Sequence, residues 1–562
     1  MKHVAVAAAP VATRRRSGEG LRRVPVLTFV VAASGLVTVP LQAPSAQSPP
    51  ASPQVAPTPC TGTPDPYGNY ACLDPYLGEN PVTRLFNYYK LEIGQSGPPV
   101  DPNAPPGRRA NLPDAPVATP PMPFTEWPYG GVTAMGVTRT ASVDSPLMAA
   151  ISNTTVGRWL GDSGIQIYGW VDAGGNISTS SRKPGGNAPI ADAYTPNTVQ
   201  LDQTVIYIER LPDTVQQDHI DWGFRLSALY GENYRYTTTY GIASYQYLKY
   251  NSVNGYDFPM LYGELYIPGV ADGLMLRFGR YVTLPDIEAQ LAPNDYTYTR
   301  SLTYAYDNYT NEGLLGTLML NKNVILQLGV TFGTETAITN LGKSIPNPNP
   351  NPLYPGTSFS KDPGAQPSGT ACVRINWNDG KDTVYPCASS INHGTWGYNN
   401  LQWYGFTYYH KFNDHWHISY EFYDEHQNGV PNVNNPAIAS GIFTTPFSSL
   451  NPATSPQLAH CSSSTLIRCN AYAIGSLAYI NYSPDGLNNI SFRPEIYYDP
   501  QGQRTGTAAT YYEFTVGWQH WLSPQIEVRP EVGYYRSNGA NAFNGRTRNY
   551  TFLVASDMIL HF

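Results

Sequence analysis

Charged side chains in the last two thirds of the chain alternate with apolar ones. Between Gln525 and Arg536, glutamate and arginine occupy one set of alternate positions, and mainly isoleucine, valine and proline occupy the other. The same pattern recurs at 490–499 and 221–230. Because successive side chains of a strand point to opposite faces, each segment has one polar and one apolar wall. Charges of both signs around a narrow, wet lumen create a transverse field that favours small polar solutes.

The charged residues that this alternation places on the polar wall are predicted to line such a lumen. They are Arg225, Glu264, Arg277, Glu421, Arg493, Glu495, Glu513, Glu527, Arg529 and Glu531. Arginine and glutamate on neighbouring strands also pair simply to stabilise a wall. A role in selectivity and a purely structural role are therefore both open for each of them.

The segment 282–310 is unusually patterned for a connection between two strands. Residues 285–291 are predicted to form one or two helical turns, with Asp286 and Glu288 near the start. By analogy with porins, whose third external loop folds into the lumen, Asp286, Glu288 and Asp295 are the candidate constriction acids. The alternative is an ordinary surface loop.

An enzymatic function has weaker support in the sequence than a polar lumen. The candidate bases are His410, His415, His417, His426 and His520. None lies in a recognisable nucleophile context, and Asp414 with His415 falls in a predicted periplasmic turn. Glycine-rich phosphate loops and nucleotide fingerprints are absent from the sequence. We expect no enzymatic activity and no cofactor.

Six cysteines fall in three close pairs, namely Cys60 and Cys72, Cys372 and Cys387, and Cys461 and Cys469. In an exported protein, local disulfides are the favoured interpretation, and the last two pairs would then staple long external loops. Zinc is the alternative, but no pair has CxxC spacing and no histidine pair stands at a matching offset. We therefore predict disulfides and no bound metal.

Strands that alternate in this way recur from Gly164 to the end of the chain. They are predicted near 164–180, 199–210, 219–231, 258–267, 273–281, 311–320, 323–333, 399–410, 415–426, 470–482, 488–499, 510–522, 525–536 and 549–562. The connections alternate between short turns and long loops, and the longest loops are 334–398 and 427–469. This sorting is typical of an outer-membrane barrel with both ends in the periplasm, whereas a soluble sandwich has no reason for it. The fold predicted is all-β, a closed antiparallel transmembrane β-barrel of about 14 strands, with a range of about 12–16.

The composition fits a barrel. Charged residues make up 13% of the 562 residues, and 43 are tyrosine. The mean hydropathy is −0.32, so the chain is not uniformly apolar. Strands that alternate lipid-facing and lumen-facing residues, with aromatic girdles, give this mixture. A spanning segment must be a helix or a closed barrel, and no apolar run of helix length follows residue 46.

The first 163 residues are predicted to precede the barrel. A basic stretch, the apolar run 24–39 and small residues near Ala46 indicate a cleaved signal peptide over 1–46; a single-pass anchor is the alternative. Without the signal, which holds six of the 34 basic and one of the 41 acidic side chains, the net charge falls from −7 to about −12. That balance argues against a nucleic-acid partner. Residues 47–163 are predicted to be a Pro-rich periplasmic lead-in, partly disordered, with a short helix at 81–94.

The chain ends in Phe562, which closes a strand with apolar or aromatic residues at nearly every second position. A terminal Phe after such a strand resembles the signal by which barrel-assembly machinery recognises its clients.

Two stretches resemble the OmpL-like β-barrel porin family. One runs from the lead-in 121–128 to Ile167-Tyr168-Gly169-Trp170-Val171-Asp172. The other is Arg277-Phe278-Gly279-Arg280-Tyr281 followed by Leu284-Pro285-Asp286-Ile287-Glu288-Ala289-Gln290 and the tyrosine-rich stretch up to 310. The resemblance covers most of 120–562 and implies an outer-membrane channel without established catalytic residues.

The resulting hypothesis is an outer-membrane porin for passive diffusion of small hydrophilic solutes and ions, with membrane lipid and the assembly machinery as partners. An adhesin or structural barrel with a plugged lumen is the alternative, and an outer-membrane hydrolase is less favoured.

Overall fold

The computed structural model divides the chain into a unit of residues 1–59 and a unit of residues 60–562. It describes residues 70–93, 145–182 and 185–562, together with Gln95 and Met135. The widest gaps in the last range are 347–358, 393–400 and 437–457, and shorter ones fall between 240 and 251, at 283, 285 and 290, between 334 and 342, at 363–364 and at 524. The predicted signal peptide, 1–46, lies outside the described residues.

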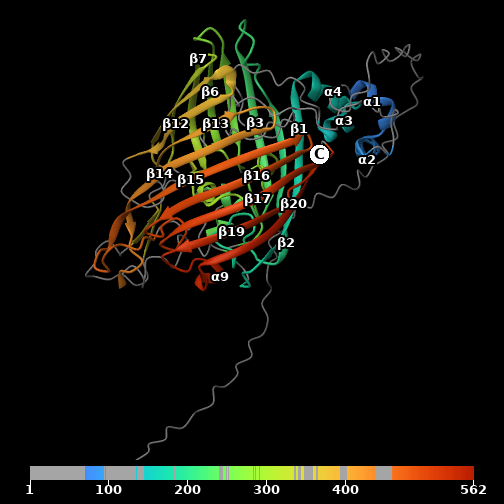
Figure 1. Ribbon diagram of the computed structural model, residues 1–562. Coiled ribbons are helices and arrows are strands. Elements are labelled where there is room, and N and C mark those ends of the chain that lie inside the picture. Colours follow the sequence, from blue (N-terminus) through green and yellow to red (C-terminus); the bar gives the residue numbers. More distant parts are fainter. Residues whose placement is uncertain are drawn as a thin grey trace, which may run out of the picture. The chain divides into compact units, whose positions relative to one another are not determined.

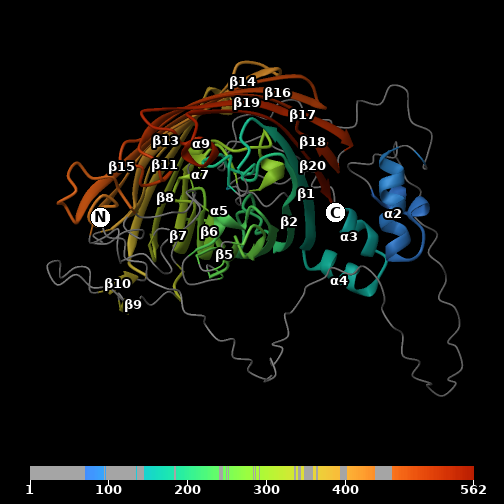
Figure 2. The same cartoon turned by 90° about the horizontal axis from the view of Figure 1, so that it is seen from below.

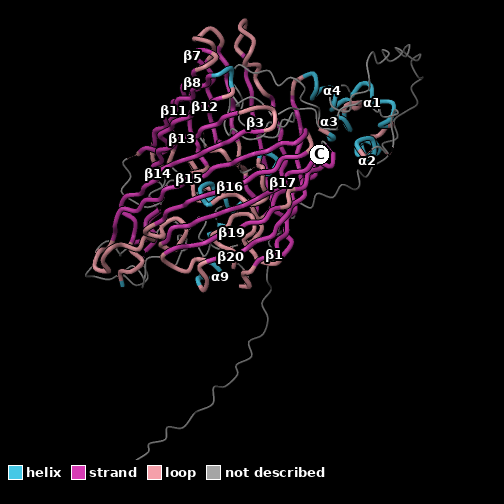
Figure 3. The backbone as a smooth tube through the Cα atoms, viewed as in Figure 1, coloured by secondary structure: helices cyan, strands magenta, loops and turns pink. Residues whose placement is uncertain are grey.

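The segments with alternating polarity form the strands of one large antiparallel sheet (Figures 1 and 3). Its strand segments are β1 (Ile165–Ser178), β2 (Thr198–Arg210), β3 (Asp221–Gly231), β4 (Gly255–Asp257), β5 (Leu261–Ile267), β6 (Leu274–Val282), β7 (Thr310–Asn321), β8 (Val324–Thr331), β11 (Ser368–Trp377), β12 (Asp382–Ile391), β13 (Gln402–Lys411), β14 (Trp416–Pro431), β15 (Arg468–Asp485), β16 (Asn488–Asp499), β17 (Ala509–Ser523), β18 (Ile526–Val528), β19 (Glu531–Asn538) and β20 (Tyr550–His561).

The sheet closes on itself. Each strand pairs with its neighbours in sequence, and β1 pairs with both β2 and β20. At the seam, Trp170 lies opposite His561, and Gly169 and Phe562 exchange both backbone hydrogen bonds. The segments β4 and β5 both pair with β3, and the segments β18 and β19 both pair with β17, so each couple counts as one interrupted strand. The closed antiparallel barrel therefore has 16 strands. The predicted fold class is confirmed, with a strand count at the upper end of the predicted range.

Proline accounts for both interrupted strands. The segment predicted as the clearest strand, 525–536, is divided at Arg529 and Pro530 into β18 and β19. Pro259 lies in the three residues that separate β4 from β5. Proline has no N–H to donate to a neighbouring strand, so the ladder is locally broken while the strand direction continues.

The prediction of one long loop over 334–398 is wrong. It contains β11 and β12, joined by a tight turn in which Asn378, Asp379 and Gly380 have positive φ values of 54°, 53° and 82°. Residues 343–362 add a separate two-stranded hairpin of β9 (Lys343–Pro346) and β10 (Phe359–Asp362). Asparagine, aspartate and glycine adopt this left-handed conformation at low cost, so the turn carries little backbone strain. The proline-rich stretch before it concealed the two strands.

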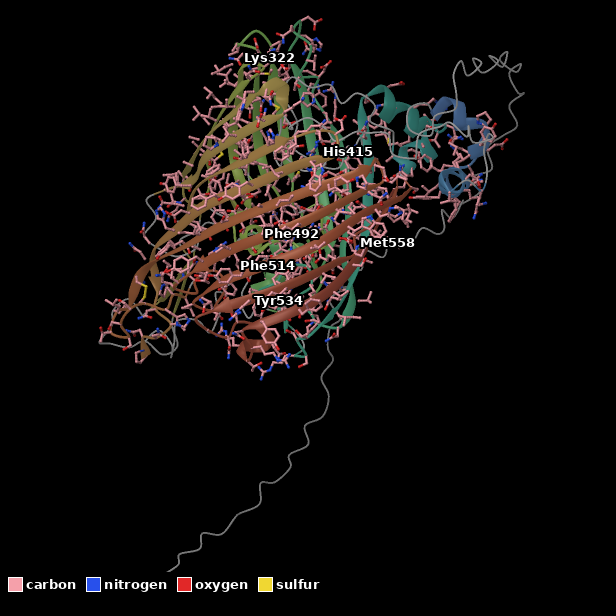
Figure 4. The ribbon with its side chains drawn as sticks, viewed as in Figure 1. Lys322, His415, Phe492, Phe514, Tyr534 and Met558 are labelled. Carbon is pink, nitrogen blue, oxygen red and sulfur yellow. A yellow bond between two sulfur atoms is a disulfide. The ribbon has the colours of Figure 1, made fainter. Side chains whose placement is uncertain are left out.

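The connections alternate as predicted. The short ones include 322–323, 378–381, 412–415 and 486–487, and they share one end of the barrel with the start of β1 and the end of β20. The long ones lie at the other end and include 179–197, 283–309 and 432–467. Lys322 and His415 mark the short-turn end in Figure 4.

The outer face of the barrel is apolar. Phe492, Phe514, Tyr534 and Met558 project outward from β16, β17, β19 and β20 (Figure 4). Their neighbours in register continue the same surface, with Phe514 opposite Pro494 and Tyr534. Phe514 is 48% exposed and Met558 is 50% exposed. Soluble proteins rarely expose a contiguous apolar surface that spans several strands, so this face requires an apolar environment.

A charge placed on this outer face should weaken the barrel in a membrane. We expect Phe514→Lys to lower the free energy of unfolding in lipid vesicles by about 2 kcal/mol, because the ammonium group leaves water for hydrocarbon. Urea titration followed by tryptophan fluorescence measures the change. His219→Lys places the same ammonium group in the exposed turn between β2 and β3 and controls for the substitution itself. An unchanged urea midpoint for Phe514→Lys would place this face in water.

The segment before the barrel contains helices. They are α1 (Tyr70–Leu77), α2 (Pro81–Glu92), α3 (Pro146–Ile151) and α4 (Thr155–Asp162), of which α2 matches the predicted helix at 81–94. Asn80 caps α2 by accepting from Thr83 N, and Pro81 fits the first turn, where no N–H is needed. Within the described part of the chain, no helix combines the length and the apolar character needed to cross a bilayer.

The helices contact the barrel at its seam. Tyr89 of α2 donates a hydrogen bond to the carbonyl of His561, at the end of β20. Ser145, the N-cap of α3, donates to the carbonyl of Ile167 in β1 at 2.7 Å. Gln525 donates to the Tyr88 hydroxyl at 3.3 Å. Residues 47–66 and 97–123 of the predicted lead-in lie outside the described residues.

Candidate functional site

The interior face of the barrel carries the charged residues. In β16, Ser491, Arg493 and Glu495 are buried, whereas Phe492 and Ile496 on the opposite face are 38% and 50% exposed. All the residues predicted to line the lumen are on this interior side and buried, at most 5% exposed. They are Arg225, Glu264, Arg277, Glu421, Arg493, Glu495, Glu513, Glu527, Arg529 and Glu531.

Several of these residues form ion pairs within the wall. Arg277 of β6 forms an ion pair with Glu264 of β5 at 2.7 Å. Arg225 of β3 pairs with Glu209 of β2 at 2.6 Å. Arg529 pairs with Asp557 of β20. Paired groups of opposite charge on adjacent strands fix the strand register, which is the structural alternative considered for them.

The segment 283–309 between β6 and β7 folds into the barrel (Figure 2). Asp286, Glu288 and Asp295 are 4%, 1% and 0% exposed. Two short helices lie in the segment, η1 (Ala292–Asn294) and α7 (Leu302–Ala305), and α7 contacts β15 and β16 of the wall. The predicted helical turns at 285–291 are wrong, because none of the residues described there, 286–289 and 291, is helical. The helical turns come later in the segment. We call residues 283–309 the lumen loop.

Arg493 is the centre of the contact between the lumen loop and the wall. Its guanidinium forms ion pairs with Glu288 of the loop at 3.1 Å and with Glu513 of β17. It also donates to the Thr297 hydroxyl at 2.8 Å and to the Thr299 hydroxyl at 3.0 Å. A buried guanidinium with several acceptors is held in one orientation, so the loop is anchored in a defined position.

Glutamates of the wall bind the backbone of the lumen loop. Glu495 accepts from the N–H of Leu302 at 3.0 Å and from Thr303, at the N-terminus of α7. Glu531 accepts from the N–H of Thr299 at 3.1 Å. Carboxylates satisfy N–H groups that the loop cannot pair internally. These residues therefore hold the loop, a role that the alternation alone did not indicate.

Two further wall residues contact the same loop. Glu421 of β14 accepts from the N–H of Ile287 at 2.8 Å. Arg529 donates to the carbonyls of Ala292 and Asp295. Together with Arg493, Glu495 and Glu531, they place anchors on β14, β16 and β19 and at the break between β18 and β19. The loop thus crosses the interior and is tied to one side of the wall.

Sequence reasoning missed other interior residues. Arg300 of the lumen loop pairs with Asp295 at 2.9 Å and with Asp192 of the loop after β1 at 3.2 Å. Arg504, in the loop after β16, donates to the carbonyls of Tyr306 and Asp307. A signal for this burial was present in the sequence. Tyrosines recur within the lumen loop at 296, 298, 304, 306 and 309, which is unsuitable for a solvated loop, and all are at most 4% exposed.

Burial changes the ionisation of the lumen-loop acids. It raises the pKa of Asp295 to about 7, although Arg300 opposes this shift. Burial and then the charge of Asp307 raise the pKa of Asp286 well above its usual value. Burial also raises the pKa of Glu288, against the effect of Arg493. The lumen loop therefore carries less negative charge at neutral pH than its sequence implies.

One of the two described disulfides has different surroundings from those predicted. Cys372 of β11 and Cys387 of β12 are bonded on the interior face of the wall, with their Cα atoms 4.1 Å apart, and do not staple a loop. Their location follows from the two strands hidden in the predicted loop. Cys461 bonds to Cys469 and ties the loop 432–467 to the start of β15. Cys60 lies outside the described residues, and with it the predicted pair with Cys72.

The histidines do not gather into one site in the described part of the chain. His415 lies in the exposed turn after β13, and its Nδ1 contacts the carbonyl of Ser483 at 2.8 Å (Figure 4). His410 pairs with Asp382 at 2.6 Å near the same end. His417 is buried beside Tyr296 of the lumen loop. His426 and His520 lie on strands, with Tyr404 and Trp518 beside them.

Comparison with known proteins gives one family. The family model described as "Putative beta-barrel porin-2, OmpL-like" matches residues 164–562. No curated protein matches the chain. Similar solved structures include the anion-selective porin from Comamonas acidovorans, with 9% identity, a TM-score of 0.41 and coverage of 71% of this chain and 99% of that one. Another is the outer membrane channel DcaP of Acinetobacter baumannii, with 8% identity, a TM-score of 0.41 and coverage of 71% and 97%.

Proposed function

Because the chain belongs to the OmpL-like β-barrel porin-2 family, we propose that it is an outer-membrane porin through which small hydrophilic solutes and ions diffuse passively. The observation that carries the proposal is the lumen loop, which is anchored by buried charges inside a closed barrel with an apolar exterior. A loop in that position sets the width and the charge of any passage. The family and the fold favour a channel over an enzyme.

The location that we propose is the outer membrane, reached after cleavage of the signal peptide at 1–46. The exposed apolar outer face is the surface that would contact lipid, and Trp222, Trp377 and Trp416 lie near its short-turn end. Aromatic residues favour that position at a membrane interface. Phe562 continues the outward-facing positions of β20, where assembly machinery would bind the terminal strand.

We further propose that the lumen loop is the constriction. Asp286, Glu288 and Asp295 contribute its acidic side, and Arg493 and Arg529 of the wall face it. Arg225, Glu264 and Arg277 line the interior on another part of the wall, away from these anchors. Charge of both signs around the loop would favour small polar solutes and exclude apolar ones.

One observation favours the alternative of a plugged barrel. The wall residues that anchor the loop, from Glu421 to Glu531, are at most 3% exposed, so the loop fills the space beside them. In that case the long external loops, including 432–467, would serve an adhesive or structural role. The two functions differ in whether ions pass through the intact protein.

Single-channel recording of the purified protein in planar bilayers separates them. We expect the wild type to conduct in small steps, and a variant with residues 286–307 replaced by a short Gly-Ser linker to conduct in larger ones. Conduction by the linker variant alone would support the plugged barrel. Silence of both proteins would contradict the porin. Heat-modifiable mobility on gels confirms that each variant is folded.

The conductance should fall as the pH falls from about 8 to about 5. In the folded loop, the pKa of Asp295 is about 7, whereas the same side chain in water has its usual value of 3.8. The docked loop therefore binds a proton that a released loop does not, and docking is favoured as the pH falls below about 7. Arg300, Arg529 and Glu288 face the group. Recording of conductance across this pH range tests the expectation.

Asp295→Asn provides the control for that titration. The amide resembles the protonated acid, so we expect a low conductance that varies much less with pH. Asp218→Asn changes an exposed acid, 82% accessible at its side chain, and should keep the wild-type profile. A pH response that is the same in Asp295→Asn and in the wild type would contradict the role of this group.

A further inference from the structure

The two ends of the lumen loop meet the wall at a group of three acidic residues. Asp286 comes from the start of the loop, Asp307 from its end, and Glu421 from β14. Their side chains are buried, at 4%, 2% and 1% exposure. Each offers a carboxylate oxygen, and these three oxygens all lie within 4.8 Å of one another. We call this group the loop-end triad.

The oxygens of the loop-end triad are largely without hydrogen-bond donors. Both oxygens of Asp286, Oδ2 of Asp307 and Oε1 of Glu421 are buried and accept no hydrogen bond from the described residues. The described residues also place no arginine or lysine in ion-pair contact with them. Some other buried acids of the interior differ, since Glu264 and Glu209 each have an arginine partner. Buried carboxylates are stable only when they are protonated or paired with a cation.

We propose that the loop-end triad binds a divalent cation of the calcium class. The donors are all oxygens, which suits a hard cation, and neither histidine nor cysteine belongs to the group. Calcium takes oxygen ligands at about 2.3–2.6 Å, so ligands on opposite sides of one ion are about 5 Å apart. The spacing in the triad fits that range. Asn308, beside Asp307, has a buried side-chain oxygen that also has no donor among the described residues.

The position of the triad gives the cation a mechanical role. Asp286 and Asp307 are 21 positions apart in sequence and frame the lumen loop, so one ion would fasten both ends of the loop to β14. Removal of the ion would leave carboxylates facing each other and would favour release of the loop. This effect on conductance rests on the proposed porin function, whereas binding of the cation does not.

Calcium binding by the full mature protein in detergent micelles tests the proposal. We expect about one bound calcium per chain in equilibrium dialysis. We also expect a terbium luminescence signal excited through Tyr423, which lies two positions from Glu421 on the same face of β14. Asp286→Asn should lose both. Asp218→Asn, an exposed acid outside the triad, should keep both. Absence of calcium binding in the folded wild type, or equal binding by Asp286→Asn, would overturn the proposal.

A stability measurement separates a bound cation from a proton shared between Asp286 and Asp307. We expect the thermal midpoint of the wild type to rise when calcium replaces chelator, and that of Asp286→Asn to stay constant. In chelator, Asp286→Asn should be the more stable of the two, because it removes one of three facing charges. A wild-type midpoint independent of calcium would indicate the shared proton and overturn the cation site. Calcium binding without conductance would leave the site intact and contradict only the porin function.

Discussion

Arg493→Met should release the lumen loop and raise the single-channel conductance several-fold. The guanidinium is fully buried and joins Glu288 of the loop to Glu513 of the wall. Its removal leaves two buried carboxylates without their main partner, and breaking a buried ion pair in this way costs about 3–5 kcal/mol. The barrel itself is held by 16 strands and should survive. The loop therefore undocks and exposes these carboxylates to water, and planar-bilayer recording detects the released loop as a higher conductance.

Two further variants make this expectation specific. Arg536→Met removes an exposed arginine of β19 and should leave the conductance unchanged. Arg493→Met combined with Glu513→Gln removes one of the stranded charges and should restore part of the docking. If Arg493→Met alone keeps the wild-type conductance and the wild-type protease resistance of the loop, the loop is not held by this residue.

Gly475→Leu should prevent docking by steric exclusion. A Cβ atom at this interior position of β15 would lie 2.8 Å from Cγ2 of Thr303 and 2.9 Å from the ring of Tyr423. A leucine adds three more carbons to a space that does not admit the first. We expect a cost of about 3 kcal/mol, at the upper end of the usual range for overpacking. Conductance should rise as it does in Arg493→Met, without any change in charge.

Ala478→Leu is the matched control for this substitution. It lies three positions along the same strand and faces the outside, where added apolar surface is tolerated. Limited proteolysis within 283–309 gives a second readout that does not depend on conduction. Equal protection of the loop in both variants would contradict the packing of α7 against β15.

The strands could be predicted because their signal is local. In β16, alternate residues such as Ser491, Arg493 and Glu495 differ in polarity from their neighbours, and the period of two is visible in a short window. The structure places the charged residues selected by this rule on the interior side of the wall. β11 and β12 were missed because the preceding proline-rich stretch resembled one long loop, although Val373, Ile375 and Trp377 alternate with polar residues.

The contacts of the lumen loop could not be predicted, because they are not local. Glu421 binds the N–H of Ile287 from 134 positions away, and Glu495 binds Leu302 from 193 positions away. A charged residue on the inner wall gives no sequence sign of which loop it holds. The glycines on that wall are a partial signal. Gly475 and Gly517 face Thr303 and Thr297 of the loop, where a side chain would not fit.

The seam between β1 and β20 determines when the barrel is completed. Trp170 pairs with His561, which lies 391 positions later in the chain, so the sheet has two unpaired edges until the last strand has been synthesised. Open edges readily join other chains. A chain that stops before Tyr550 leaves β1 paired with β2 alone, and the ring stays open. Tyr89 binds the end of β20, and Ser145 binds β1. The helices before the barrel therefore contact both strands of the seam and stabilise the closed ring.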